Sequence, residues 1–228
     1  MTPQGSGSPR PKIKLCGQTR LEDIRISFDL GADFCGVVVN VPSSPRSMDI
    51  KNAGPLFKQF GSKLFALTAN ADLSSLSEIA RELKPAYFQL TADETPEFVK
   101  NALDSIGIPI FKSLHLPTAE NSAPAPQSRH FLDVMAKYQE AGCAGFVLDS
   151  KNNGLYGGTG VKSDWNLANE IIRDSGSKVF LAGGITPQNI SMAKGLNPYG
   201  LDLASGVETS PGIKSREKIE SLFKAFGN

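Results

Sequence analysis

Short apolar runs alternate along this chain with longer segments in which apolar residues recur every three or four positions. A short run bounded by turn residues predicts a buried strand, and the longer spacing predicts an amphipathic helix. The expected strands are 12–16, 34–39, 63–68, 87–90, 109–112, 144–148, 178–182 and 200–203. The expected helices are 21–30, 50–60, 73–83, 96–106, 131–141, 164–173, 187–194 and 215–226.

This alternation makes eight strand–helix units. Repeated units of this kind predict parallel strands with right-handed crossovers, and eight of them favour a closed (β/α)8 TIM barrel. We expect a single α/β domain over residues 12–228. A doubly wound open sheet is the alternative, but the early dinucleotide-binding glycine pattern that would favour it is missing. In a barrel, functional residues follow the carboxyl ends of the strands.

Composition narrows the classes of partner. The net charge of +1 gives no electrostatic case for nucleic acid or an anionic membrane, and no apolar run has the length of a membrane span. Residues 1–11, rich in Pro, Gly and Ser, predict a disordered extension and not a signal peptide. The three scattered cysteines, Cys16, Cys35 and Cys143, favour reduced thiols in a cytoplasmic protein and argue against a disulfide framework or a zinc site.

Two reactive side chains end expected strands. Asp149 follows the apolar run at 144–148 and precedes a glycine-rich stretch at 157–160, while Cys16 ends the first strand. A carboxyl group and a thiol on opposite sides of a barrel mouth can act as acid and base in an isomerisation. Alternatively, Asp149 caps a turn and Cys16 is a small buried residue.

Further candidates lie in three loops. Glycines follow the seventh and eighth strands, at Gly183, Gly184 and Gly206, with Ser205 beside the last. Barrels use these two loops to bind phosphate, although both could be ordinary strand–helix turns. Arg46, in a proline-stiffened loop, is a candidate partner for a substrate carboxylate.

Several of these motifs occur together in one known family. The stretches Lys14-Leu-Cys16-Gly17-Gln-Thr19-Arg20, Ser44-Pro45-Arg46, Asp149, Gly157-Gly158-Thr159-Gly160 with Asp164-Trp165, Ala182-Gly183-Gly184 and Ser205-Gly206-Val207-Glu208 stand in that family's order from about Lys12 to the C-terminus. The chain thereby resembles the phosphoribosylanthranilate isomerases of tryptophan biosynthesis.

The resemblance implies a cytoplasmic barrel enzyme, without cofactor or metal, that performs an Amadori rearrangement on a phosphosugar as a monomer or homodimer. The product would be 1-(2-carboxyphenylamino)-1-deoxyribulose 5-phosphate. It implies that Cys16 is the general base and Asp149 the general acid. Arg46 would bind the anthranilate carboxylate. The loops at Gly183-Gly184 and Ser205-Gly206 would bind the phosphate, with Asp202 nearby. An electropositive site would help to keep the thiol partly ionised.

The chain also departs from the family pattern. Thr91 and Ala92 stand where Gln-Leu-His-Gly is usual, and we expect a neighbouring group or a water to fill the space left by the histidine. Strand three ends in Leu67-Thr68-Ala69-Asn70 instead of Val-Phe-Val-Asn. Both histidines, His115 and His130, flank the loop after the fifth strand and are expected on the surface.

Two alternatives to this function remain open. One is a related phosphosugar barrel, such as an epimerase or a thiamine-phosphate synthase, although a metal-dependent epimerase would need more histidine ligands. The other is a non-catalytic phosphosugar-binding paralogue.

Overall fold

The computed structural model describes residues 10–117, 127–152, 155–156 and 164–227. The glycine-rich stretch at 157–160 and most of the expected N-terminal extension at 1–11 lie outside these residues, so both remain predictions.

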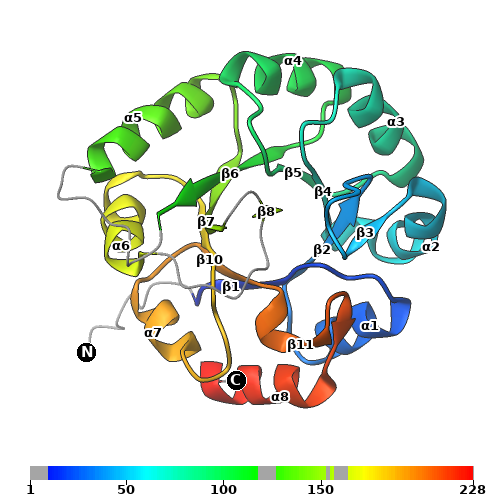
Figure 1. The fold of residues 1–228 in the computed structure, drawn as a ribbon, viewed down its shortest axis with the longest axis vertical. Coiled ribbons are helices and arrows are strands. Elements are labelled where there is room, and N and C mark those ends of the chain that lie inside the picture. Colours follow the sequence, from blue (N-terminus) through cyan, green and yellow to red (C-terminus); the bar gives the residue numbers. More distant parts are fainter. Residues whose placement is uncertain (1–9, 118–126, 153–154, 157–163, 228) are drawn as a thin grey trace, which may run out of the picture.

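Eight parallel strands close into a barrel, because β1 pairs with both β2 and β10 (Figure 1). This confirms the predicted fold class. Around the ring, in order, the strands are β1 (Lys12–Leu15), β10 (Gly200–Leu203), β9 (Val179–Leu181), β7 (Gly145–Asn152), β6 (Ile110–Leu116), β5 (Tyr87–Leu90), β4 (Leu64–Thr68) and β2 (Phe34–Val39).

An outer ring of helices surrounds the barrel (Figure 1). They are α1 (Leu21–Asp29), α2 (Ile50–Phe60), α3 (Leu73–Leu83), α4 (Pro96–Ile106), α5 (Gln127–Glu140), α6 (Trp165–Asp174), α7 (Ile190–Gly195) and α8 (Arg216–Phe226). The bounds of α2, α3 and α4 are those that the sequence predicted. Each begins after a capping side chain, Asp49, Asp72 or Thr95, that accepts a hydrogen bond from a backbone N–H of the first turn.

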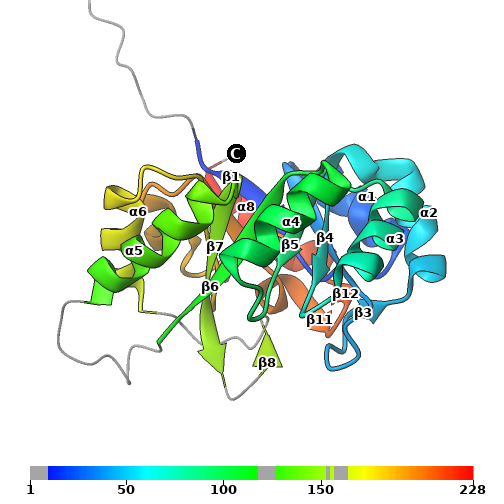
Figure 2. The same ribbon diagram turned by 90° about the horizontal axis from the view of Figure 1, so that it is seen from above.

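Short elements at the carboxyl ends of the strands were not predicted. They are β3 (Ser47–Met48), β8 (Leu155–Tyr156), the hairpin of β11 (Glu208–Ser210) and β12 (Ile213–Lys214), and a 3-10 turn at Ser205–Val207; a further 3-10 turn, Gly61–Lys63, precedes β4. Elements of two or three residues carry too little periodicity to be read from sequence. Figure 2 shows β3, β8, β11 and β12 gathered at one face, opposite the start of β1.

Strand β7 corrects the prediction that a strand ends at Leu148. It continues to Asn152, because β6 pairs with it as far as Ser150 and β8 then pairs with Lys151 and Asn152. Asp149 therefore lies within a strand, and pairing with β6 fixes the direction of its backbone.

Aromatic side chains fill the inside of the barrel below its mouth. The ring of Phe65 packs against Phe34, Tyr87, Phe111 and Phe180, with centroids between 4.6 and 6.0 Å apart. The edge-to-face and stacked geometries of these rings add to the stabilisation from apolar burial. The barrel interior is thus a packed core, and the open space lies only above it.

A buried ion pair joins three neighbouring strands near the mouth. Glu94 accepts hydrogen bonds from the backbone N–H groups of Asn70 and Ala92, and one of its carboxylate oxygens lies 3.2 Å from Lys112 Nζ. Lys112 Nζ also donates to Ala92 O at 2.6 Å. Both side chains are buried, so this pair fixes the loops after β4 and β5 relative to β6.

This pair yields a stability prediction. Glu94→Ala should lower the free energy of unfolding by about 3–5 kcal/mol, because it leaves a buried lysine unpaired. The matched control is Arg216→Ala, which removes the exposed pair of Arg216 with Glu220 and should cost at most about 0.5 kcal/mol. Urea titrations of the two variants measure both values. Equal small losses would show that Lys112 tolerates burial without its partner.

Candidate active site

A cavity opens at the carboxyl ends of the strands, with about 720 Å³ of empty space including its mouth. Every site residue predicted from the sequence lines it: Cys16, Arg46, Asp149, Gly183, Gly184, Asp202, Ser205 and Gly206. The structure thus brings together residues from six loops and strands that lie far apart along the chain.

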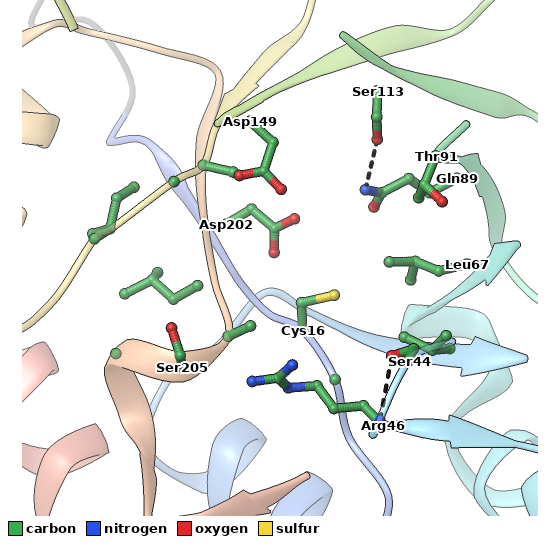
Figure 3. A pocket seen from close by; sticks show the side chains of 18 of the residues that line it. Cys16, Ser44, Arg46, Leu67, Gln89, Thr91, Ser113, Asp149, Asp202 and Ser205 are labelled. Atoms are coloured by element: carbon green, nitrogen blue, oxygen red, sulfur yellow. Dashed lines mark hydrogen bonds between the residues drawn. The ribbon is translucent and has the colours of Figure 1, made fainter. Parts of the chain in front are cut away.

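The two predicted catalytic groups approach the cavity from different strands. Cys16 follows β1 directly, and Asp149 projects from β7. Figure 3 shows the Cys16 thiol and the carboxylates of Asp149 and Asp202 converging on the same space. An acid and a base are therefore available at one small region of the cavity.

Cys16 sits in a dry and charged environment, with 8% of its surface exposed. Burial raises the pKa of the Cys16 thiol, and nearby Asp202 raises it too; Lys14 and Lys214 act in the opposite direction without prevailing. The cationic groups expected to assist ionisation are Lys14 and Lys214, and both act to lower the pKa of the thiol. The lysines are present, but the loss of hydration outweighs them.

Lys14 and Asp202 form a buried ion pair beneath the site. They are register partners on β1 and β10, and Lys14 Nζ lies 2.8 Å from Asp202 Oδ2. Burial opposes the charge on Lys14, but Asp202 and Cys16 together raise the Lys14 pKa. The other oxygen, Asp202 Oδ1, is buried without a hydrogen-bond partner among the described residues. Since Asp202 lines the cavity, this oxygen is a ready acceptor for a ligand hydroxyl.

Arg46 is held by a second buried ion pair. Its Nε and Nη2 donate to Glu208 at 2.9 and 2.6 Å, and Lys214 Nζ donates to Glu208 at 2.9 Å. The hydrogen bond from Arg46 to Glu208 raises the Arg46 pKa. Burial opposes ionisation of Glu208, but Arg46 and Lys214 hold its pKa below the usual value. Lys214 Nζ also donates to the carbonyl of Cys16, so this cluster fixes the backbone at the base.

The two glycine loops meet on one side of the cavity. Gly183 and Gly184 both have positive φ, 83° and 68°, which glycine adopts without strain. A Cβ at Gly206 would lie 2.0 Å from the carbonyl oxygen of Ile185. The two backbones can approach this closely only because residue 206 has no side chain.

His115 corrects the expectation that both histidines lie on the surface. His130 is exposed, but His115 is only partly exposed and lines the cavity. Its Nε2 lies 2.8 Å from Thr91 O, and because a carbonyl only accepts, Nε2 carries the proton. The Thr91 hydroxyl donates to Thr68 O at 2.8 Å. His115 is thus a candidate for the neighbouring group that we expected beside Thr91.

Sequence reasoning missed several polar residues of the site. Gln89, Ser113 and Glu208 are buried, and so are the lysines at 14 and 214. One signal was available, since Lys14 stands between Ile13 and Leu15 in an otherwise apolar strand. A charge in a strand buried on both faces requires a partner, and such a strand therefore predicts a buried pair.

No described helix has the length and apolarity needed to cross a membrane. Among the described residues, no three His, Cys, Asp or Glu side chains form a group that could hold a metal ion.

Comparisons with known proteins agree with the geometry. The family model "N-(5'phosphoribosyl)anthranilate (PRA) isomerase" matches residues 13–225. The N-(5'-phosphoribosyl)anthranilate isomerase of Myxococcus xanthus is 34% identical, over 94% of this chain and 95% of its own length. That of Methanosarcina acetivorans is 32% identical, over 93% of each chain.

Solved structures give the same result. The phosphoribosyl anthranilate isomerase of Thermus thermophilus superposes with a TM-score of 0.77 at 30% identity, over 94% of this chain and 97% of that one. The enzyme of Thermococcus kodakaraensis gives 0.80 at 26% identity, over 96% and 99%. With a family model spanning the barrel and relatives of similar length above 30% identity, the chain belongs to the N-(5'-phosphoribosyl)anthranilate isomerase family of tryptophan biosynthesis.

Proposed function

We propose that this chain isomerises N-(5'-phosphoribosyl)anthranilate with Cys16 as general base and Asp149 as general acid. The observation that carries the proposal is the convergence of this thiol and this carboxyl group on one cavity, beside two glycine loops suited to phosphate. Membership of the isomerase family supports the same reaction.

The proposed reaction is a series of proton transfers. The carboxylic acid of Asp149 gives its proton to the furanose ring oxygen, the bond from that oxygen to C1' breaks, and a protonated Schiff base forms. The thiolate of Cys16 then takes the proton from C2', and the electron pair neutralises the imine to give an enolamine. The enol proton then passes to the Asp149 carboxylate and C1' takes the proton held by Cys16, which gives the ketone, 1-(2-carboxyphenylamino)-1-deoxyribulose 5-phosphate, and restores both groups. Each step is general acid–base chemistry and needs no redox partner.

Six further residues have proposed binding roles. Nε and Nη2 of Arg46 are used by Glu208, so Nη1 is the donor proposed for the anthranilate carboxylate. The buried Oδ1 of Asp202 accepts a ribose hydroxyl, because a second anion would be repelled there. Gly183, Gly184, Ser205 and Gly206 hold the phosphate. Three cationic side chains, Lys14, Arg46 and Lys214, form ion pairs with only two carboxylates, those of Asp202 and Glu208. The excess of positive charge in this cluster suits an anionic substrate.

We also propose a cytoplasmic enzyme, either a monomer or a homodimer. The free thiols of Cys16, Cys35 and Cys143 suit a reducing compartment, and one solved relative, from Thermotoga maritima, is described as dimeric. Purified protein should consume the fluorescent substrate in a continuous assay. Tight phosphosugar binding without consumption would instead indicate a non-catalytic paralogue.

The acid and base assignments predict large losses of rate. Cys16→Ala and Asp149→Asn should each lower kcat by about two to four orders of magnitude, the usual contribution of a positioned acid or base. Cys143→Ala is the matched control. The Cys143 thiol is hydrogen-bonded to Ile110 O and Gly145 O, and Cys143 is not among the residues that line the cavity. If a folded Cys16→Ala or Asp149→Asn enzyme keeps near-normal turnover, the replaced residue does not have the role proposed for it.

The environment of Cys16 predicts a pH dependence. Only the thiolate can act as base, and burial raises the pKa of this thiol, so its ionised fraction grows as pH rises. In the Asp149→Asn variant, whose amide does not titrate, the residual kcat/KM should therefore increase about tenfold per unit between roughly pH 6.5 and 8.5, below the usual thiol pKa. Initial rates at low substrate concentration measure it. A flat profile over that interval would mean that another group is the base.

The glycine loops predict phosphate inhibition. Inorganic phosphate should compete with substrate, and Gly206→Ala should weaken this inhibition by at least about tenfold, or 1.4 kcal/mol, because its Cβ would collide with Ile185 O. Gly54→Ala is the matched control, since a Cβ at Gly54 in α2 meets no neighbouring atom within 4 Å. Unchanged phosphate inhibition in a folded Gly206→Ala enzyme would place the phosphate elsewhere.

A further inference from the structure

We propose that His115 is a substrate-binding residue that holds the arylamino half of the substrate beside Asp149. The inference rests on the proposed function and adds to it a contact made by this chain's own histidine. Its evidence is the position of His115 in the barrel, the bond that fixes its ring, and an unsatisfied acceptor in the same corner of the cavity.

The order of the strands places His115 next to Asp149 and opposite Cys16. On β6, His115 is the register partner of Asp149 on β7, and register partners on parallel strands present side chains to the same face. In the ring of eight strands, β6 lies halfway round from β1, so His115 stands across the mouth from Cys16. A substrate carbon held between the acid and the base therefore lies next to this imidazole.

The phosphate end of the substrate points away from this corner. Its proposed loops follow β9 and β10, whose opposite strands in the ring are β4 and β5. The arylamino end must then lie toward the wall formed by β4, β5 and β6. Leu67 supplies apolar surface on that wall, and His115 adds a flat ring against which an aromatic group can pack.

The imidazole is held in one orientation. Its Nε2 donates to the backbone oxygen of Thr91. The Thr91 hydroxyl donates instead to Thr68 O. A ring anchored through one nitrogen loses little conformational entropy when a ligand packs against it. His115 is therefore prepared for binding before the substrate arrives.

Gln89 shows independently that a ligand belongs in this corner. It is 4% exposed, its Nε2 donates to Ser113 Oγ at 3.0 Å, and its Oε1 is buried without a partner among the described residues. Gln89 lines the same cavity as His115 and points into it in Figure 3. A buried amide oxygen that lacks a donor is costly, and the N–H of an arylamine would satisfy it.

The test separates substrate binding from support of the wall. His115→Ala should raise KM about ten- to hundredfold with a smaller change in kcat. It should weaken binding of a product analogue, reduced 1-(o-carboxyphenylamino)-1-deoxyribulose 5-phosphate, by a similar factor. His115→Gln places an amide nitrogen where Nε2 was, which can still donate to Thr91 O. The glutamine variant should recover the wild-type melting temperature but keep the raised KM, because it lacks the ring.

Two controls complete the design. His130→Ala removes the exposed histidine and should leave KM unchanged within about twofold, the scale of a surface substitution. Inhibition by inorganic phosphate should be equal in wild type and both His115 variants, since its loops lie on other strands.

Three results would overturn the inference: an unchanged KM in His115→Ala, full recovery of KM by His115→Gln, or a parallel loss of phosphate inhibition. Each leaves the wild-type activity in place, so the proposed function would stand.

Discussion

The pairing of buried charges around Cys16 is the constraint on which the site depends. The aromatic rings below exclude water, so every charge above them must find a partner in the protein. Lys14 pairs with Asp202 between adjacent strands, and Glu208 pairs with both Arg46 and Lys214. These bonds tie the β2–β3 loop and the β11–β12 hairpin to the end of β1. The hairpin therefore supports Cys16, the proposed base, although it is far from β1 in sequence.

The same pairing explains why the thiol is difficult to ionise. Each lysine near Cys16 already has a carboxylate, and dehydration costs the thiolate more than these partly neutralised cations return. A base of raised pKa is a stronger proton acceptor once it is ionised, which suits removal of a proton from carbon. The Cys16 thiol is thus ionised in only a small fraction of the molecules, but each thiolate is a strong base.

The barrel and its principal residues were predictable, because they depend on local patterns. Strand and helix periodicity fixed the eight units, and side-chain caps such as Asp49 and Asp72 fixed helix starts to the residue. The extension of β7 beyond Leu148 and the pairing of Lys14 with Asp202 depend on contacts between strands distant in sequence. His115 was misjudged for the same reason, since its direction into the cavity follows from its register with Asp149.

The two sides of the cavity differ in what forms their walls. On the proposed phosphate side the backbone is the wall, because a Cβ at Gly206 would lie 2.0 Å from Ile185 O. Such contacts exclude any side chain, so substitution there changes the path of the chain. On the β5–β6 side the wall consists of the side chains of Gln89, Thr91 and His115. Gln89 donates to Ser113 Oγ, and His115 donates to the Thr91 carbonyl. In a wall made of side chains, a group on one strand can be replaced by a group on the neighbouring strand. The β5–β6 side is also where this chain departs from its family's usual sequence.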